Sequence, residues 1–362
     1  MLSDIPIAVN RLTVLPDIRA VAYLKAMTRL KSWLPDSFIL ALLATVALAT
    51  VLPATGGAAP IAAWASNIAI ALLFFLHGAR LSREAVLGGL KQPKLHAMVL
   101  ASTFVLFPLL GLGLQAAMPR LVAPELWTGI LFICTLSSTV QSSIAFTSIA
   151  KGNVPAAVCA ATVSNLAGIV VTPVLAGLLL HRQGGMEFGS FGQIVVELLL
   201  PFVAGQALRP WIGAWTARNR TLLSLVDRGS ILLAVYSAFG AAVAEGIWHL
   251  FPPLELVRLV VANALLLGLV LALSTLAARL FGLKRADEIV LVFCGSKKSL
   301  AAGIPMATVL FAGPTVGVVL LPIMIFHQMQ LMVCAVLAKR YGREPVAQGA
   351  DAGGVPATTR MT

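Results

Sequence analysis

Long apolar segments recur along this chain of 362 residues and constrain its fold more than any other feature. A membrane-spanning helix needs about 20 apolar residues in succession. Only 11% of the residues are charged, whereas soluble domains carry about 25%. Outer-membrane barrels alternate apolar and polar residues over short segments, and these segments do not. The sequence therefore predicts an all-α membrane protein with ten transmembrane helices, at roughly 37–53, 60–79, 95–117, 126–148, 154–180, 190–208, 229–248, 254–278, 288–311 and 314–338.

The basic residues predict the orientation of these spans. Of the 26 Lys and Arg residues, 21 fall in the two termini and in the loops on the same side of the membrane, and the opposite loops hold only Arg120 and Arg182. Basic residues accumulate on the cytoplasmic side, so both termini are expected on the cytoplasmic side of a bacterial inner membrane. Because the positive charges flank apolar segments, the net charge of +12 predicts no nucleic-acid partner.

The chain divides into four parts by composition. Residues 1–36 form a basic cytoplasmic arm without a secretory signal; part of it could form an interfacial helix, and the alternatives are a disordered tail or translation starting at Met27. Residues 342–362 predict a disordered cytoplasmic tail. Between them, 37–183 and 184–341 hold five spans each, and an odd number per half inverts the second half relative to the first, as in many secondary transporters.

Two adjacent lysines, Lys297 and Lys298, interrupt an apolar segment of the ninth span. One Lys at the centre of a membrane helix costs roughly 2.5–3.5 kcal/mol to insert, so such residues indicate a functional site. The fourth span carries a second polar run, Thr135-Leu-Ser-Ser-Thr-Val-Gln-Ser-Ser143. Gly and Pro weaken the ninth span, and hydroxyl groups can satisfy the backbone groups that a broken helix leaves free. We expect both helices to be discontinuous near the bilayer centre, although Ser and Thr could also bond within intact helices.

Broken helices present N–H ends that suit anions and C=O ends that suit cations. The two runs therefore predict a substrate- or ion-binding site made of Gly295, Ser296, Lys297, Lys298, Ser299, Thr139, Gln141, Ser142 and Ser143, with His327 and Gln328 of the tenth span nearby. For His327 itself the pattern favours a packing role, with ligand binding as the alternative. Glu197, the one acid well inside an apolar segment, is a candidate proton carrier or a surface group reaching an interface.

Motifs for other chemistries are lacking in the sequence. There is no Gly-x-x-x-x-Gly-Lys-Ser/Thr phosphate loop, no His-Glu-x-x-His and no paired-carboxylate motif. We therefore expect no enzyme, no catalytic residues and no cofactor. The four cysteines lie inside apolar spans, where they are better explained as packing residues than as a metal site or disulfide framework.

Six short motifs are spread across the membrane region: Phe74-Phe-Leu-His-Gly-Ala-Arg-Leu81, Pro93-Lys-Leu-His96, Ala150-Lys-Gly-Asn-Val154, Thr162-Val-Ser-Asn165, Gly295-Ser-Lys-Lys-Ser-Leu-Ala301 and His327-Gln-Met-Gln-Leu331. On these motifs the chain resembles the bile acid:sodium symporter superfamily, in particular its sodium/bile-acid-cotransporter-7-like subgroup, which includes bacterial symporter-like proteins. The resemblance implies a panel of spans 1, 2, 6 and 7 and a core of spans 3–5 and 8–10. It also implies that spans 4 and 9 cross where they are unwound, with Asn165 facing the crossing.

The chain departs from the family at the sodium ligands. Typical members have a Glu in the ninth helix where Phe293 stands here, and Ser143-Ile144 replaces their Ser-Asn. Ala157 and Ala161 stand in the place of ligand hydroxyls. We infer that one ammonium substitutes for the sodium ion and donates to Gln141, Ser143, Ser164 and exposed carbonyl groups. The other lysine could meet an anionic substrate, a carboxylate or a water-filled cavity, and either could carry a proton.

The sequence thus predicts a secondary transporter of a small, anionic organic solute, with the lipid bilayer as its other partner and an oligomeric state that the sequence does not define. The driving force would be protons or the solute gradient. Three alternatives stay open: a sodium-coupled symporter, a regulatory membrane protein that uses a transporter fold without transport, and membrane-embedded catalysis on a lipid.

Overall fold

The computed structural model describes residues 37–80, 92–180, 188–244, 246, 252–311, 313 and 315–343. The prediction for the basic arm, 1–36, falls outside these residues, as does that for the C-terminal tail, 342–362, except at 342 and 343, which are helical and not disordered. The chain divides into two compact units, 1–44 and 45–362. Of the first unit only the beginning of helix α2 (Ser37–Val51) is described. The helices from α3 onward all belong to the second unit.

Every regular element within the described residues is helical. Beyond α2 they are α3 (Ala58–Arg80), α5 (Pro93–Ala101), the π-helix η2 (Ser102–Leu106), α6 (Phe107–Ala117), α7 (Pro124–Thr135), α8 (Gln141–Ile149), α9 (Val154–Leu180), α10 (Phe188–Arg218), α11 (Arg220–Ala244), α13 (Pro253–Leu280), α14 (Arg285–Gly295), α15 (Leu300–Leu310) and α16 (Thr315–Arg343). The absence of strands from this part of the chain confirms the predicted all-α class.

Among the described residues, seven helical segments are long and apolar enough to cross a membrane. They are Ala58–Arg80, Pro93–Ala117, Val154–Leu180, Arg220–Ala244, Pro253–Leu280, Arg285–Leu310 and Thr315–Arg343. The other three predicted spans correspond to the short α2, to the interrupted pair α7 and α8, and to α10. Ten membrane crossings and the inverted repeat therefore stay predictions.

The predicted length of the loop between the sixth and seventh spans was wrong. We expected a basic loop over 209–228, but α10 continues to Arg218 and α11 begins at Arg220. Arg is a good helix former, so the helices extend past the apolar segments that predicted them. The arginines at 209, 218, 220 and 228 consequently lie on or at the ends of helices.

Helix α3 packs against both α10 and α11. Its contact with α10 is close because two glycines face the opposite backbone. A Cβ atom on Gly78 would lie 2.0 Å from the Phe202 carbonyl oxygen, and one on Gly205 would lie 1.9 Å from that of Phe75. Small residues allow this kind of approach between membrane helices.

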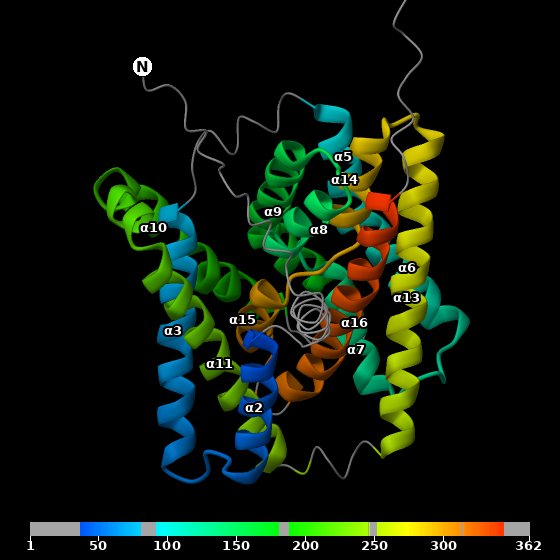
Figure 1. Ribbon diagram of the computed structural model, residues 1–362. Coiled ribbons are helices and arrows are strands. Elements are labelled where there is room, and N and C mark those ends of the chain that lie inside the picture. The colour runs from blue at the N-terminus through cyan, green and yellow to red at the C-terminus, as the bar shows by residue number, and fades with distance from the viewer. Residues whose placement is uncertain are drawn as a thin grey trace, which may run out of the picture. The chain divides into compact units, whose positions relative to one another are not determined.

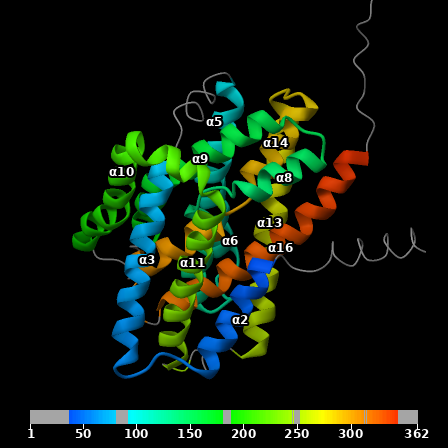
Figure 2. The same cartoon turned by 60° about the vertical axis from the view of Figure 1, so that its left-hand side comes forward.

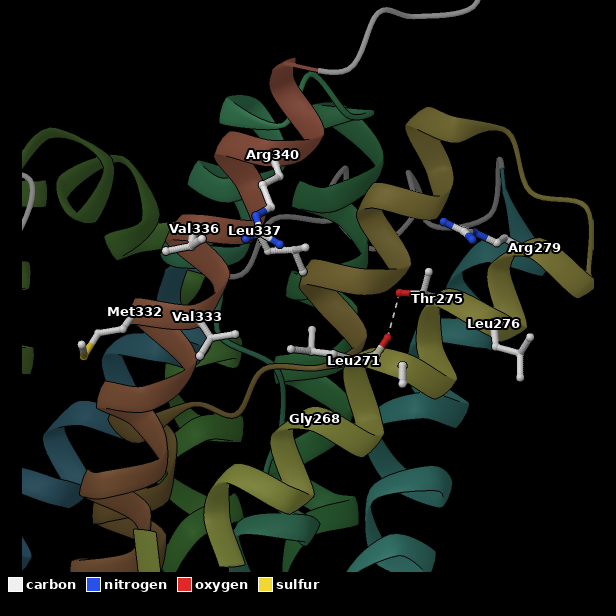
Figure 3. A pocket seen from close by; sticks show the side chains of 11 residues that line it. Gly268, Leu271, Thr275, Leu276, Arg279, Met332, Val333, Val336, Leu337 and Arg340 are labelled. Carbon is white, nitrogen blue, oxygen red and sulfur yellow. Dashed lines mark hydrogen bonds between the residues drawn. The ribbon is translucent and has the colours of Figure 1, made fainter. Parts of the chain in front are cut away.

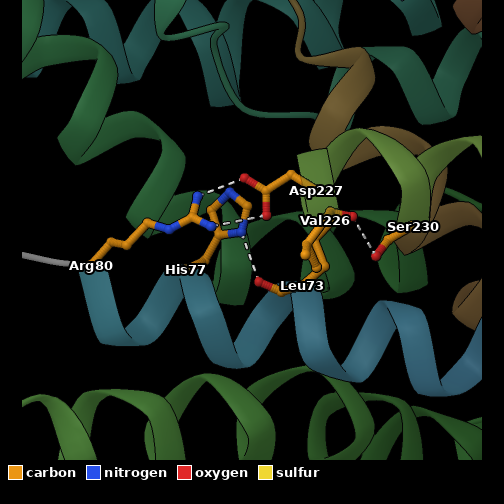
Figure 4. A network of polar contacts seen from close by, with 6 residues as sticks. All are labelled: Leu73, His77, Arg80, Val226, Asp227 and Ser230. Atoms are coloured by element: carbon orange, nitrogen blue, oxygen red, sulfur yellow. Dashed lines mark hydrogen bonds and ion pairs between the residues drawn. The ribbon is translucent and has the colours of Figure 1, made fainter. Parts of the chain in front are cut away.

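An ion pair joins α3 to α11 near the C-terminal end of α3 (Figure 4). The Arg80 guanidinium donates to both carboxylate oxygens of Asp227, at 2.6 and 3.2 Å. The adjacent His77 ring bonds the Leu73 carbonyl of its own helix at 2.8 Å. These contacts and the glycine packing hold α3, α10 and α11 together as one group.

Two helical segments are interrupted, as the sequence predicted. Residues 136–140 separate α7 from α8. Residues 296–299 separate α14 from α15 and join them as an extended segment (Figure 1). Helices α8 and α14 lie side by side (Figures 1 and 2). The window of Arg285–Leu310 is 89% buried, against 28–44% for the other six candidate spans. The interruption that carries both lysines therefore lies in the interior of the protein.

Candidate functional site

The two interruptions contact each other directly. The backbone N–H of Ser299 donates to the Ser137 carbonyl at 2.8 Å, so the linker between α14 and α15 pairs with the linker between α7 and α8. Ser143 at the start of α8 also donates to the Phe293 carbonyl of α14, at 2.9 Å. These bonds satisfy backbone groups that the broken helices leave free, and they bring the two predicted polar runs together.

Lys298 is buried where the linkers meet, with 2% of its surface exposed. Its ammonium donates to three backbone carbonyl oxygens, those of Thr103, Cys134 and Leu136, at 2.7, 2.9 and 2.6 Å. The Phe107 ring lies close by, 4.0 Å from Nζ to the ring centroid. Three acceptors match the three donors of a lysine, so the polar capacity of this ammonium is fully used.

The local backbone explains why these carbonyls are free to accept. Cys134 and Leu136 lie at the C-terminal end of α7, where carbonyls lack intrahelical partners and the helix dipole is negative. Thr103 lies in η2, where the Phe107 N–H bonds to Ser102, five residues back. With the same spacing of five residues, the Thr103 carbonyl would accept from the N–H of residue 108, but Pro108 has no N–H. The π-turn and the proline together leave the Thr103 carbonyl for Lys298.

Gln330 of α16 holds the backbone of Lys298 in place. Its side-chain oxygen accepts from the Lys298 N–H and its side-chain nitrogen donates to the Lys298 carbonyl, both at 2.8 Å. The same nitrogen lies 2.8 Å from Nδ1 of His327. An amide that pairs with both polar groups of an unwound residue replaces the bonds that a helix would have made.

Lys297 is also fully buried but has different neighbours. Its ammonium donates to the Ser142 hydroxyl at 3.3 Å. Two aromatic rings also lie near it, with Nζ 4.3 Å from the Phe146 centroid and 5.8 Å from that of Phe293. One hydroxyl for three donors leaves this ammonium with unused hydrogen-bonding capacity.

Neither lysine has an acidic partner in the described part of the chain. Ion pairs in that part of the chain form elsewhere, for example between Arg80 and Asp227, Arg258 and Glu255, and Arg279 and Glu288. The same residues contain no group of three or more His, Cys, Asp or Glu side chains that could hold a metal ion. The site is therefore cationic and is built from hydroxyls, carbonyls and rings.

The predicted side-chain ligands of the lysines were wrong in part. Within the described residues neither ammonium donates to Gln141, Ser143 or Ser164. Gln141 is exposed, and Ser164 accepts from the Ser138 N–H at 3.1 Å. The Ser143 hydroxyl donates to the Phe293 carbonyl instead. The cation is held by main-chain oxygens, which residue types do not reveal.

Several other predicted residues lie at the crossing in supporting positions. Thr139 bonds to Ser142 and Ser143 at 2.8 and 3.1 Å, and Asn165 accepts from the Ser137 hydroxyl at 3.1 Å. Ser299 caps α15 by accepting from the Ala302 N–H at 3.2 Å.

Gly295 and Ser296 satisfy the end of α14. The Gly295 carbonyl accepts from Ser102 at 3.0 Å, and Ser296 donates to Val292. A Cβ on Gly295 would lie 2.9 Å from the Ser102 hydroxyl, so glycine permits this approach.

The described contacts do not place Gln328 or Glu197 at the crossing. Gln328 is half-buried, and its side-chain oxygen is buried with no hydrogen-bond partner among the described residues. Glu197 falls in α10, but its side chain lies outside the described part of the structure. Its proposed role as a proton carrier stays a prediction.

Apolar packing fills the places where the resemblance put sodium ligands. The Phe293 ring is buried and packs against Phe146 and Tyr341, with centroids 6.0 and 6.1 Å apart. Ala157 and Ala161 are buried in one cluster with Val290, Leu291 and Cys294.

Sequence reasoning missed Thr103, Pro108 and Ser102, and it included Gln330 only within the motif His327-Gln-Met-Gln-Leu331, without a role at the crossing. A proline inside an apolar span and a glutamine in the middle of another were the available signals. Neither signal alone indicates which distant segment the residue contacts.

Apolar helices of spanning length, one of them almost wholly buried, define an integral membrane protein. Residues 36–343 match the model of the SBF-like CPA transporter family, and the chain belongs to that family, whose members are transporters rather than enzymes. The predicted bile acid:sodium symporter resemblance is thereby confirmed.

Curated relatives agree with this assignment. The chain is 58% identical to uncharacterized protein PA2026 of Pseudomonas aeruginosa over 313 residues, covering 86% of this chain and 94% of that protein. It is 50% identical to "Putative symporter YfeH" of Escherichia coli K12 over 310 residues, covering 85% and 93%. It is 29% identical to sodium/bile acid cotransporter 7 of Rattus norvegicus over 276 residues, covering 75% and 81%.

Proposed function

We propose that this protein is a secondary transporter that moves a small organic anion across the bacterial inner membrane by alternating access, with the Lys298 ammonium in the place of a bound sodium ion. Membership of a transporter family supports transport of a small solute. Symport and sodium coupling appear in the names of relatives. The chemistry of the buried site bears on whether this chain is also coupled to sodium.

The observation that carries the proposal is the trio of carbonyl oxygens around the Lys298 ammonium, at 2.6–2.9 Å. Backbone carbonyls at broken helix ends are typical ligands of transported sodium. Here a covalently attached cation occupies such a cluster, so no dissolved cation is needed to neutralise it. This favours coupling to protons or to the solute gradient over coupling to sodium.

Lys297 supports the anionic character of the solute. A buried charge without a partner is strongly destabilising, and this ammonium has only one hydroxyl. That hydroxyl belongs to Ser142 in the first turn of α8, and no side chain of the described residues caps the N-terminus of this helix. Free N–H groups, a positive helix end and an ammonium together suit a carboxylate or a similar anion.

The proposed fold is ten helices in two inverted repeats, 37–183 and 184–341, with both termini cytoplasmic. Support comes from the two interruptions, which fall in the predicted fourth and ninth spans. It also comes from the packing of α3 against both α10 and α11, which correspond to spans 2, 6 and 7 of the proposed panel of spans 1, 2, 6 and 7. Motion of this panel against the lysine-bearing core would expose the crossing to each side in turn.

A rescue experiment tests the substitution of lysine for sodium. In the purified Lys298→Ala variant the three carbonyls lose their donor, so its thermal unfolding midpoint should fall in choline chloride. NaCl or methylammonium chloride should raise it again, because a ligand that binds only the folded state stabilises it by RT ln(1 + [L]/Kd). The wild-type midpoint should not distinguish sodium from choline.

Lys297→Ala is the matched control, because it removes the neighbouring charge and leaves the carbonyl cluster occupied. The thermal unfolding midpoint of Lys297→Ala should not change with sodium. Carboxylates and sulfonates that stabilise the wild type should no longer stabilise this variant. A wild-type protein stabilised by millimolar sodium would overturn the substitution and favour a sodium-coupled symporter. Proteoliposomes that neither accumulate nor exchange any anion that stabilises the protein would favour a regulatory role without transport.

A further inference from the structure

A groove of about 760 Å³ runs between α13 and α16 (Figure 3), and neither Lys297 nor Lys298 is among the residues that line it. Its walls are apolar and include Leu271 and Leu276 of α13 and Met332 and Val336 of α16. The Thr275 hydroxyl also faces this region, but it donates to the Leu271 carbonyl of its own helix at 2.8 Å. Along most of its length the groove therefore offers no free polar group to an occupant.

Two arginines, Arg279 and Arg340, line the groove at one end, near the C-termini of α13 and α16 (Figure 3). Only Nε of Arg279 lies near an acid, 3.7 Å from Glu288, and 65% of this side chain is exposed. Arg340 is exposed, and no hydrogen bond or ion pair engages it among the described residues. The terminal nitrogens of both guanidinium groups are available to an external anion.

The length of the groove corresponds to one leaflet of a bilayer. From Gly268 to Arg279 a helix rises about 16 Å at 1.5 Å per residue, and half of the hydrocarbon core is about 15 Å thick. Both helices have spanning length, so the groove opens where lipid surrounds the protein. By the distribution of basic residues, the arginine end faces the cytoplasmic leaflet.

We propose that this groove is a binding site for one anionic phospholipid, with the phosphate held by Arg279 and Arg340 and an acyl chain lying along the apolar wall. Guanidinium groups bind phosphate oxygens in a two-pronged geometry, and basic pockets between membrane helices hold acidic headgroups. A zwitterionic lipid would leave the same chain contacts but a weaker headgroup contact. Because α13 and α16 pack on the interrupted helices α14 and α7, the lipid would brace the core beside the crossing.

The test uses the full-length protein, stripped of lipid in detergent and titrated with dioleoyl phosphatidylglycerol or dioleoyl phosphatidylethanolamine. We expect phosphatidylglycerol to raise the thermal midpoint at lower concentration and to remain bound in native mass spectrometry. In Arg279→Gln/Arg340→Gln its affinity should fall at least tenfold. Arg218→Gln/Arg220→Gln removes the same charge from exposed arginines outside the groove and should bind like the wild type.

A second variant separates the groove from the charge. Gly268 lines the groove and nothing lies within 4 Å of a Cβ placed on it, so the Gly268→Leu side chain has open space at its base, should narrow the groove and should weaken retention of both lipids. Equal affinity for the two lipids, or unchanged phosphatidylglycerol binding in the double arginine variant, would overturn the proposal. A disulfide-linked dimer formed by Val336→Cys in membranes, and not by the wild type, would assign the groove to a second copy of the chain instead.

Discussion

Lys297 and Lys298 are neighbours in the chain and are both buried, yet their surroundings differ sharply. Lys298 is held by three carbonyl oxygens from η2, α7 and the linker that follows α7. Lys297 has one hydroxyl at 3.3 Å and two aromatic rings. Because 296–299 is unwound, successive side chains can point to opposite sides of the linker, and one pair of identical residues serves two environments.

This contrast teaches that burial alone does not define the role of a charge. An ammonium with every donor satisfied is part of the structure, and its removal leaves several acceptors unpaired. An ammonium with unused donors is costly to the fold, and such a cost is expected at sites that bind a ligand. We therefore assign the structural role to Lys298 and the ligand-binding role to Lys297.

The largest predicted effect compares Lys298→Met with Lys297→Met, two changes that roughly keep the side-chain length. Lys298→Met should cost about 3–5 kcal/mol of unfolding free energy, as expected when one partner of a buried charged contact is lost. Lys297→Met should lie within about 1 kcal/mol of the wild type or above it, because an apolar residue replaces an uncompensated charge. Thermal unfolding in one detergent measures both, and equal losses would abolish the distinction between the lysines.

Gln330→Leu should have the next largest effect. It leaves the N–H and C=O of Lys298 without their partners, at a cost of about 2–3 kcal/mol. Gln328→Leu is the matched control on the same helix, since its side-chain oxygen has no partner to lose among the described residues. If both variants unfold at the same temperature, Gln330 does not hold the linker. Because Gln330 acts on the backbone of Lys298, its loss should also weaken the methylammonium rescue of Lys298→Ala.

The sequence predicted more of the helix positions than of the contacts in the candidate site. The predicted span 154–180 coincides with α9, and both interruptions fall at the predicted runs of hydroxyl residues, joined by Gly and Pro only in the ninth span, because local composition governs whether a membrane helix can continue. Apolar length did not predict the ends of α10 and α11, because a helix tolerates arginines beyond the bilayer. The ligands of Lys298 could not be predicted, since they are backbone atoms that three-dimensional packing brings together from residues 103, 134 and 136.

Ser143→Ala tests the hydroxyl groups that support the crossing on the side of Lys297. Ser143 is fully buried and donates to the Phe293 carbonyl, so its loss should cost about 1–2 kcal/mol. Thr147→Val on the same helix is the control, because the Thr147 hydroxyl is buried without a partner in the described residues and its loss should be neutral or stabilising. Chemical denaturation of the pair in parallel checks the difference. A larger loss in Thr147→Val than in Ser143→Ala would contradict the assigned hydrogen bond.

The smallest effect concerns the aromatic rings, and it sharpens the comparison because the nearest ring lies at a similar distance from each ammonium. Nζ lies 4.3 Å from the Phe146 centroid for Lys297 and 4.0 Å from the Phe107 centroid for Lys298. Double-mutant cycles that combine Phe146→Leu with Lys297→Met, and Phe107→Leu with Lys298→Met, isolate each contact from the cavity that each leucine leaves. Both cycles should give a favourable coupling of about 0.5–2 kcal/mol. Similar couplings would mean that the carbonyl oxygens, and not the rings, make Lys298 the fixed cation. A much stronger coupling at Phe146 would instead mean that Lys297 is already held in place and is not free to meet an anion.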